Sequence, residues 1–215
     1  MRQPARLAVL ISGGGTGLQN LIDRVADGRV AAQIAVVLSS RRDAGGLERA
    51  GRAGIPALTV PRKEFADVEQ FNDAVHDALA PYEVDFVILA GFLSPFQLRQ
   101  RYVGRVLNIH PALIPAFCGK GFYGDRVHRA VIESGVKVSG CTIHLADDDY
   151  DHGPIVLQGV VPVLDDDTPE TLSTRVHALE NELYPEAIQL LASGRLEIVG
   201  RRVHIRPAPQ SDEDS

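Results

Sequence analysis

Asn108 and His110 are the residues of this chain whose types and spacing point most directly to chemistry. They stand two apart in the apolar segment 106–110, which has the length of a β-strand. Because alternate side chains of a strand point the same way, we expect both on one face. A neutral amide donor beside an ionisable imidazole suits an oxyanion that develops during a reaction. Pro111 follows and ends the strand, since proline has no N–H for the sheet ladder.

A short acidic segment, residues 147–153, reads Asp-Asp-Asp-Tyr-Asp-His-Gly. Its first, third and fifth positions match the first three ligand positions of an EF-hand calcium loop. That loop also needs glycine where His152 stands, glutamate where Gln158 stands, and flanking helices where we expect strands. A solvated acidic turn is therefore the interpretation for most of the segment. Asp151 differs, because it precedes Gly153 and an apolar strand, where a loop carboxylate is able to turn inward.

Three of the seven histidines are expected on helix or strand surfaces, namely His76, His177 and His204. His128 lies early in an expected helix and could line a cleft. A zinc site made of His110, His144 and Asp151 is conceivable, because three such ligands suit an open site. The chain has neither a His-x-x-x-His pair nor a paired-cysteine motif. We therefore prefer a metal-free acid–base pair.

A glycine-rich loop, Gly-Gly-Gly-Thr-Gly at residues 13–17, lies between the apolar strand 7–11 and a helix expected from about Leu18. Glycines let the backbone approach an anion, and the free N–H groups of a helix start point at it. The loop lacks the Gly-Lys-Ser/Thr ending of a Walker loop. It also lacks the third glycine of a dinucleotide fingerprint, because Leu18 and Asn20 occupy the positions concerned. The pattern indicates one phosphate, and a plain strand-to-helix turn is the alternative.

Glu180 borders the apolar stripe of the longest expected helix, four residues after Val176 and three before Leu183. A carboxylate there needs a partner, because a lone buried charge is costly. The partner is either an arginine, with Arg175 and Arg129 available, or a hydroxyl or amine of a substrate.

Strand-length apolar runs alternate with helix-period segments through the first half of the chain. This predicts an α/β fold with a mostly parallel sheet and helices on both faces. The runs 138–145 and 155–163 predict an antiparallel hairpin, Thr168 and Pro169 are expected to start the long helix, and residues 196–205 predict a final hairpin. The expected strands of the first half are 7–11, 34–38, 57–60, 86–90 and 106–110, and its helices include 47–53 and 68–79.

Composition limits the classes of function. The chain has 215 residues, 45% of them hydrophobic, and a net charge of -6. We expect one domain, residues 1–206, and a disordered acidic tail, residues 207–215. The charge argues against bulk binding of nucleic acid or anionic membranes. Two cysteines, no signal-peptide pattern and no membrane-length apolar run are typical of a cytoplasmic protein.

Several motifs together resemble the folate-dependent phosphoribosylglycinamide formyltransferase family of purine synthesis. The resemblance extends from about Leu7 to Ile205. Its motifs are Ile-Ser-Gly-Gly-Gly-Thr-Gly-Leu at 11–18, Leu-Ala-Gly-Phe at 89–92, Asn-Ile-His-Pro-Ala-Leu-Ile-Pro at 108–115, Gly-Cys-Thr-Ile-His at 140–144, Asp-His-Gly-Pro-Ile-Val-Leu-Gln at 151–158, and Glu180 ahead of Tyr184-Pro185.

The resemblance implies a Rossmann-like formyltransferase fold and an enzyme that transfers a formyl group from 10-formyltetrahydrofolate to glycinamide ribonucleotide, without a metal. It implies that the catalytic residues are Asn108, His110 and Asp151, with His144 supporting them. It places the substrate phosphate at Gly15, Thr16 and Gly17 and the ribose at Glu180. It places the folate at Leu93, Ser94, Pro95, Phe96, Asn108, Asp147, Asp148, Asp149, Tyr150 and Asp151. A monomer or a homodimer is expected.

The mechanism that follows is a hypothesis with three roles. Asn108 and protonated His110 donate to the oxyanion of a tetrahedral species. Asp151 favours the imidazolium and can also take the proton of the attacking amine, directly or through water. A formyltetrahydrofolate hydrolase would normally have an N-terminal regulatory domain, whereas the first strand here is expected at Leu7. A methionyl-tRNA formyltransferase would need a C-terminal RNA-binding domain. A nucleotide-binding sensor would need no oxyanion site.

Overall fold

The computed structural model describes residues 3–147 and 149–208. The N-terminal half alternates strands and helices, as predicted, and α1 begins two residues earlier than expected. Its elements are β1 (Ala5–Ile11), α1 (Thr16–Ala26), β2 (Ala32–Ser39), α2 (Gly46–Arg52), β3 (Ala57–Thr59), α3 (Val68–Leu79), β4 (Phe86–Leu89), α4 (Arg99–Tyr102) and β5 (Val106–His110).

The C-terminal half contains α5 (Asp125–Ser134), β6 (Val138–Leu145), β7 (Ile155–Pro162), α6 (Pro169–Ala192), β8 (Leu196–Val199) and β9 (Arg202–Ile205). The predicted start of α6 is confirmed, because the Thr168 side chain accepts a hydrogen bond from the Thr171 N–H and Pro169 is the first helical residue. Residues 207 and 208 lie outside helices and strands. The remainder of the predicted tail, 209–215, lies outside the described residues.

Within the described residues, nine strands form one sheet in the order β3-β2-β1-β4-β5-β6-β7-β9-β8. The strands from β3 to β5 pair in parallel, whereas β6 is antiparallel to both β5 and β7. β9 joins β7 in parallel and pairs antiparallel with β8. The predicted parallel sheet with an antiparallel C-terminal part is confirmed.

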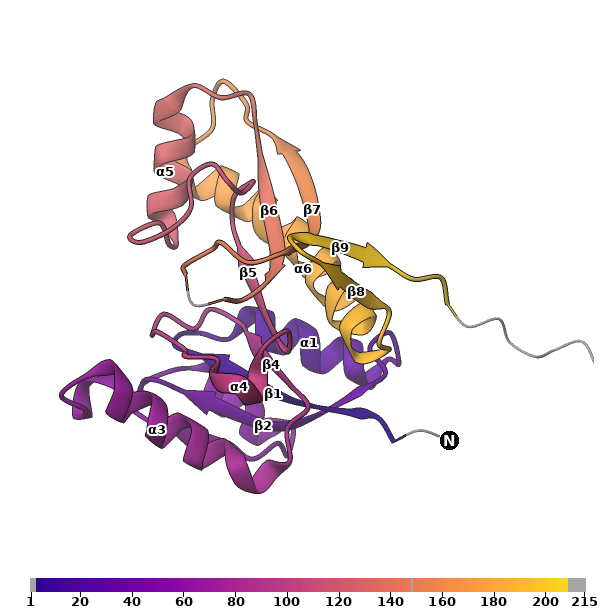
Figure 1. The fold of residues 1–215 in the computed structure, drawn as a ribbon. Helices are drawn as coiled ribbons and strands as arrows, with labels where there is room; N and C mark the ends of the chain where they lie inside the picture. The colour runs from indigo at the N-terminus through magenta and orange to yellow at the C-terminus, as the bar shows by residue number, and fades with distance from the viewer. Residues whose placement is uncertain (1–2, 148, 209–215) are drawn as a thin grey trace, which may run out of the picture.

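Hydrophobic cores cover both faces of the sheet, and Figure 1 shows α1 and α3 on its opposite sides. On one face Leu107 belongs to a core that includes residues of α1, α2, α5 and α6. On the other face Val106 belongs to a core that includes residues of α3 and α4. Because neighbouring residues of β5 point to opposite cores, Asn108 and His110 share the face of Val106, as predicted.

Helix α6 holds the N-terminal and C-terminal halves of the fold together. The predicted apolar stripe is present. In the C-terminal part of the helix the buried surface is wider than this stripe, because Tyr184, Pro185 and Ile188 are also buried. The Tyr184 hydroxyl donates to the carbonyls of Leu89, the last residue of β4, and Leu107, the second residue of β5, each at 3.0 Å. This contact holds the helix across the two strands beside which the candidate site is built.

Candidate active site

The pairing of β5 with β6 sets the first contact of the site. Its register places Asn108 opposite His144. The Asn108 amide Nδ2 donates to His144 Nε2 at 3.0 Å, and His144 Nδ1 lies 3.1 Å from the Leu145 carbonyl. Nδ1 therefore donates to that carbonyl, and Nε2 is the acceptor for the amide. His144, which is buried, holds the Asn108 side chain in place.

The acidic turn brings Asp151 onto the same residues. Asp151 has a left-handed backbone, with φ of 57°, and only 11% of its side chain is exposed. Its Oδ1 lies 3.4 Å from Asn108 Nδ2, and its Oδ2 accepts from the Gly119 N–H at 2.9 Å. The inward orientation predicted for this carboxylate is confirmed.

Gly153 makes this turn possible. A Cβ atom built on Gly153 would lie 1.8 Å from the Leu145 carbonyl oxygen, a contact that no side chain tolerates. The turn that carries Asp151 and the end of β6 therefore approach more closely than any other residue would allow.

We expect Gly153→Ala to lower the free energy of unfolding by about 2 kcal/mol or more, because overpacking typically costs 1–3 kcal/mol. Urea unfolding measures the change. Gly51→Ala is the matched control, because Gly51 lies in α2 with nothing within 4 Å of a built Cβ. The control should be neutral or slightly stabilising. Equal stability of the two variants would refute the proposed close approach.

His110 is enclosed between two oxygen acceptors. Its Nε2 lies 2.8 Å from the Phe117 carbonyl, and its Nδ1 lies 3.4 Å from Asp151 Oδ2. Burial lowers the pKa of His110, and the Asp151 charge and the Phe117 carbonyl oppose this shift without reversing it. The protonated His110 of the mechanistic hypothesis is thus disfavoured in this structure, although a protonated ring would find an acceptor for each N–H.

Asp151 is ionised in this setting. Burial alone would raise the pKa of Asp151, but the interactions with His144, His110 and the Gly119 N–H together lower it. A carboxylate with a lowered pKa is a weak base and a good fixed negative charge. This favours a role for Asp151 in stabilising positive charge nearby.

The Asn108 amide is already engaged. Its Nδ2 has two hydrogens, and its acceptors are His144 at 3.0 Å and Asp151 at 3.4 Å. An oxyanion would therefore have to replace one of these two contacts. The longer contact, to Asp151, is the one that an oxyanion would replace, since it is the weaker bond. Catalytic hydrogen bonds are often long before the substrate arrives.

The glycine loop forms a second part of the site. Gly15 has φ of 72°, and a Cβ atom there would lie 2.6 Å from the Gly46 backbone. Only glycine fits, so the loop lies closely on α2. Thr16 and Gly17 begin α1, where the first N–H groups have no partner inside the helix. This geometry suits an anion, as the sequence indicates.

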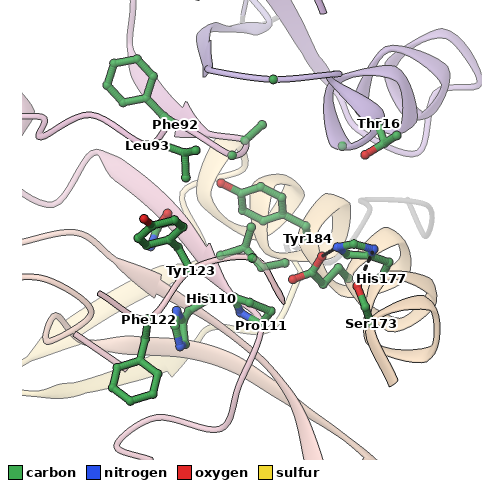
Figure 2. Close-up of a pocket in the computed structure, with 18 of the residues that line it drawn as sticks. Thr16, Phe92, Leu93, His110, Pro111, Phe122, Tyr123, Ser173, His177 and Tyr184 are labelled. Atoms are coloured by element: carbon green, nitrogen blue, oxygen red, sulfur yellow. Dashed lines mark hydrogen bonds and ion pairs between the residues drawn. The ribbon is translucent and has the colours of Figure 1, made fainter. Parts of the chain in front are cut away.

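Glu180 on α6 faces the same space. Arg175, an expected partner, instead binds Asp167 at 2.8 Å. The side chain of His177, predicted to be a surface residue, lies beside it, with Nε2 3.8 Å from Glu180 Oε2. Figure 2 shows His177 and Ser173 on α6 at the wall of the cavity, across from Thr16. Burial raises the pKa of Glu180 to about 7.

Two cavities meet at the catalytic candidates. The larger, about 880 Å³, is lined by residues 13–17 and by Glu180. The smaller, about 280 Å³, extends between residues 94–97 and the acidic turn. Asn108 and Asp151 line both. A group bound in one cavity is therefore able to meet a group bound in the other beside these two side chains.

The predicted folate residues are divided between these cavities. Leu93 lines the larger cavity and not the smaller one. Asp148 lies outside the described residues. The smaller cavity is lined by the other predicted residues, namely Ser94, Pro95, Phe96, Asn108, Asp147, Asp149, Tyr150 and Asp151.

Sequence reasoning missed the loop of residues 117–124 as part of the site. Its backbone meets both His110 and Asp151, and Figure 2 shows Phe122 and Tyr123 beside the cavity. The glycines at 119, 121 and 124, all with positive φ, were the available signal. His128, predicted as a candidate cleft residue, lines the larger cavity. In residues 3–147 and 149–208, no three histidine, cysteine or acidic residues gather to hold a metal ion.

Comparisons with known proteins agree on one family. A model of the family described as "Formyl transferase" matches residues 5–188. The chain is 43% identical over 195 residues to a chloroplastic phosphoribosylglycinamide formyltransferase of Arabidopsis thaliana, covering 89% of this chain and 66% of the relative. It is 39% identical to the phosphoribosylglycinamide formyltransferase of Haemophilus influenzae, covering 90% of each chain.

A solved structure gives the same result. The chain resembles a glycinamide ribonucleotide transformylase from Symbiobacterium toebii with a TM-score of 0.88 and 45% identity, over 96% of each chain. The chain thus spans just under two thirds of the plant relative and nearly the whole of the bacterial ones. No helix within the described residues is both long and apolar enough to cross a membrane.

Proposed function

Because this chain belongs to the formyl transferase family, we propose that it transfers a formyl group from 10-formyltetrahydrofolate to the amine of glycinamide ribonucleotide, a step of purine biosynthesis. The observation that supports this most is the junction of two cavities at Asn108 and Asp151. Residues 1–206 act as one formyltransferase domain, as a monomer or a homodimer in the cytoplasm.

The proposal assigns each substrate to one cavity. The phosphate of the ribonucleotide binds the N–H groups at Gly15, Thr16 and Gly17, and its ribose binds Glu180 in the larger cavity. The folate occupies the smaller cavity, between residues 94–97 and the acidic turn. Its formyl group then reaches the junction, where holding both reactants in place removes much of the entropic barrier.

At the junction the amine nitrogen attacks the formyl carbon, which forms a new C–N bond and an oxyanion. The Asn108 amide donates to that oxygen in place of its contact with Asp151. The charge of Asp151 stabilises the ammonium that the attack creates, and it partly offsets the lowering of the His110 pKa by burial. Breaking the old C–N bond releases the folate nitrogen, which takes up the proton that the amine loses.

Absorbance-monitored turnover of the purified full chain tests the assignment. We expect folate product from a 10-formylated folate only when glycinamide ribonucleotide is present. Product at the same rate without the ribonucleotide would indicate a hydrolase of the same fold, and no product in either mixture would argue against an enzyme of this class. Calorimetric titration with NAD tests the remaining alternative, because tight binding would support a nucleotide-binding sensor.

The raised pKa of Glu180 predicts how substrate affinity depends on pH. An ionised carboxylate accepts hydrogen bonds from ribose hydroxyls more strongly than a protonated one does. Because the pKa is about 7, Glu180 gains a proton as the pH falls through 7. We expect KM for the ribonucleotide to rise there, while KM for the folate changes little.

Glu180→Gln is the matched control for this pH profile, since it cannot ionise. It should raise KM for the ribonucleotide at every pH. Its KM should also lack the pH dependence that ionisation of Glu180 causes in the wild type. Any titration of the substrate amine remains in both proteins and cancels in the ratio of their KM values. A ratio that does not vary with pH would refute the proposed role of the carboxylate.

A further inference from the structure

The wall of the smaller cavity is held from outside by two polar side chains of α3. Asn72 is fully buried although it is polar. Its Oδ1 accepts from the Gln97 N–H at 2.8 Å, and its Nδ2 donates to the Pro95 carbonyl at 3.2 Å. The same Nδ2 donates to Val68 within the helix at 2.8 Å. The amide thus joins α3 to both sides of Phe96.

His76 lies one helical turn further along α3 and makes the next contact. Its Nε2 lies 2.8 Å from the Gln97 carbonyl, to which it donates. Its ring packs against both Phe96 and Tyr102, with ring centroids 5.2 Å and 5.5 Å away, and those two rings also contact each other at 5.9 Å. Tyr102 is buried. The imidazole therefore fixes the main chain at Gln97 and supports the ring of Phe96 at the same time.

These contacts concern a segment without regular structure of its own. Residues 92–98 contain no helix or strand, so neighbouring parts of the fold must determine their conformation. Pro95, Phe96 and Gln97 line the smaller cavity, whereas Asn72 and His76 do not. Residues 95–97 do not line the larger cavity. A shift of these three residues would therefore change the smaller cavity and leave the lining of the larger one in place.

We propose that Asn72 and His76 are positioning residues for the formyl donor, which hold residues 95–97 in the shape that binds the folate. This rests on the proposed function, because it takes the smaller cavity as the folate site. Neither side chain touches the reacting atoms. Losing either should therefore weaken folate binding much more than it slows the chemical step.

Asn72→Leu and His76→Leu test the proposal, since leucine fills a similar space without hydrogen bonds. We expect each to raise KM for the 10-formylated folate about tenfold, with KM for the ribonucleotide within about twofold of wild type. His76→Gln should recover most of the loss, because its amide is able to donate to Gln97. Asp77→Asn, an exposed change on the same helix, is the control and should have no effect.

Two further measurements distinguish weaker folate binding from a loss of folding. Urea unfolding establishes that each variant is folded under the assay conditions. Fluorescence titration with 5-formyltetrahydrofolate measures folate affinity without turnover. Equal folate affinity in wild type and both leucine variants would overturn the inference while leaving the proposed function intact, and so would an equal rise of KM for both substrates. Failure of the wild-type chain to bind the folate or to transfer the formyl group would instead overturn the proposed function and the inference with it.

Discussion

Asp151→Asn should lower kcat by about 10²–10⁴-fold, the range typical of a lost acid–base or charge-stabilising group. Asparagine has the same shape and still accepts from the Gly119 N–H, so the turn should keep its conformation. What disappears is the negative charge that faces His110 at 3.4 Å and His144 at 3.6 Å. KM for each substrate should change little, because the loss falls on the transition state.

Steady-state kinetics with both substrates varied measure this effect. Asp165→Asn is the matched control, because Asp165 is exposed after β7 and pairs with Lys137. Surface ion pairs of this kind contribute little to stability. Turnover of Asp151→Asn within about fivefold of wild type would contradict the catalytic role of the carboxylate.

Asn108→Ala is expected to lower kcat/KM by roughly 10²–10³-fold, since one lost oxyanion donor costs about 2.7–4 kcal/mol in the transition state. The variant also leaves His144 Nε2 without its partner. A loss of stability of about 1–3 kcal/mol should accompany the loss of activity. The two effects are separated by measuring kinetics well below the midpoint of thermal unfolding.

The matched control for this change is Gln33→Ala, which removes a surface amide of β2 that accepts from Arg6. It should leave kcat/KM unchanged. If Asn108→Ala retained near-normal kcat/KM while it was destabilised, the amide would be structural and the oxyanion assignment would be wrong.

The parallel half of the fold follows directly from the sequence. Apolar runs of strand length and helix-period segments give β1 to β5 and their helices, and the residues of β5 were predicted without error at either end. The catalytic candidates lie at or after strand ends, as ligands do in open α/β sheets. The shared face of Asn108 and His110 needs only the two-residue period of a strand.

The contacts between segments that are distant in the sequence could not be predicted from these patterns. His144 becomes the partner of Asn108 through the register of β5 and β6, and register depends on the whole sheet. The position of residues 117–124 over His110 depends on loop conformation rather than on periodicity. The pKa directions of His110 and Asp151 depend on burial and on several neighbours at once. The predicted roles of these residues therefore lacked their contacts and their pKa directions.

His177 illustrates the same limit on a helix. Its position on α6 predicts an exposed histidine, and the residue is exposed. However, its exposed surface faces a cavity that several elements form together, beside Glu180. Helical periodicity tells which residues avoid the core, but it does not tell whether they face open solvent or a binding cavity.

The measurement that tests the central claim most directly is to determine which product receives the formyl carbon. The purified chain would be mixed with 10-formyltetrahydrofolate labelled with ¹³C in the formyl group and with glycinamide ribonucleotide, and the products identified by mass spectrometry. Transfer between two cavities at Asn108 and Asp151 predicts that the label appears in formylglycinamide ribonucleotide. Label found in free formate, with the ribonucleotide unchanged, would contradict the account.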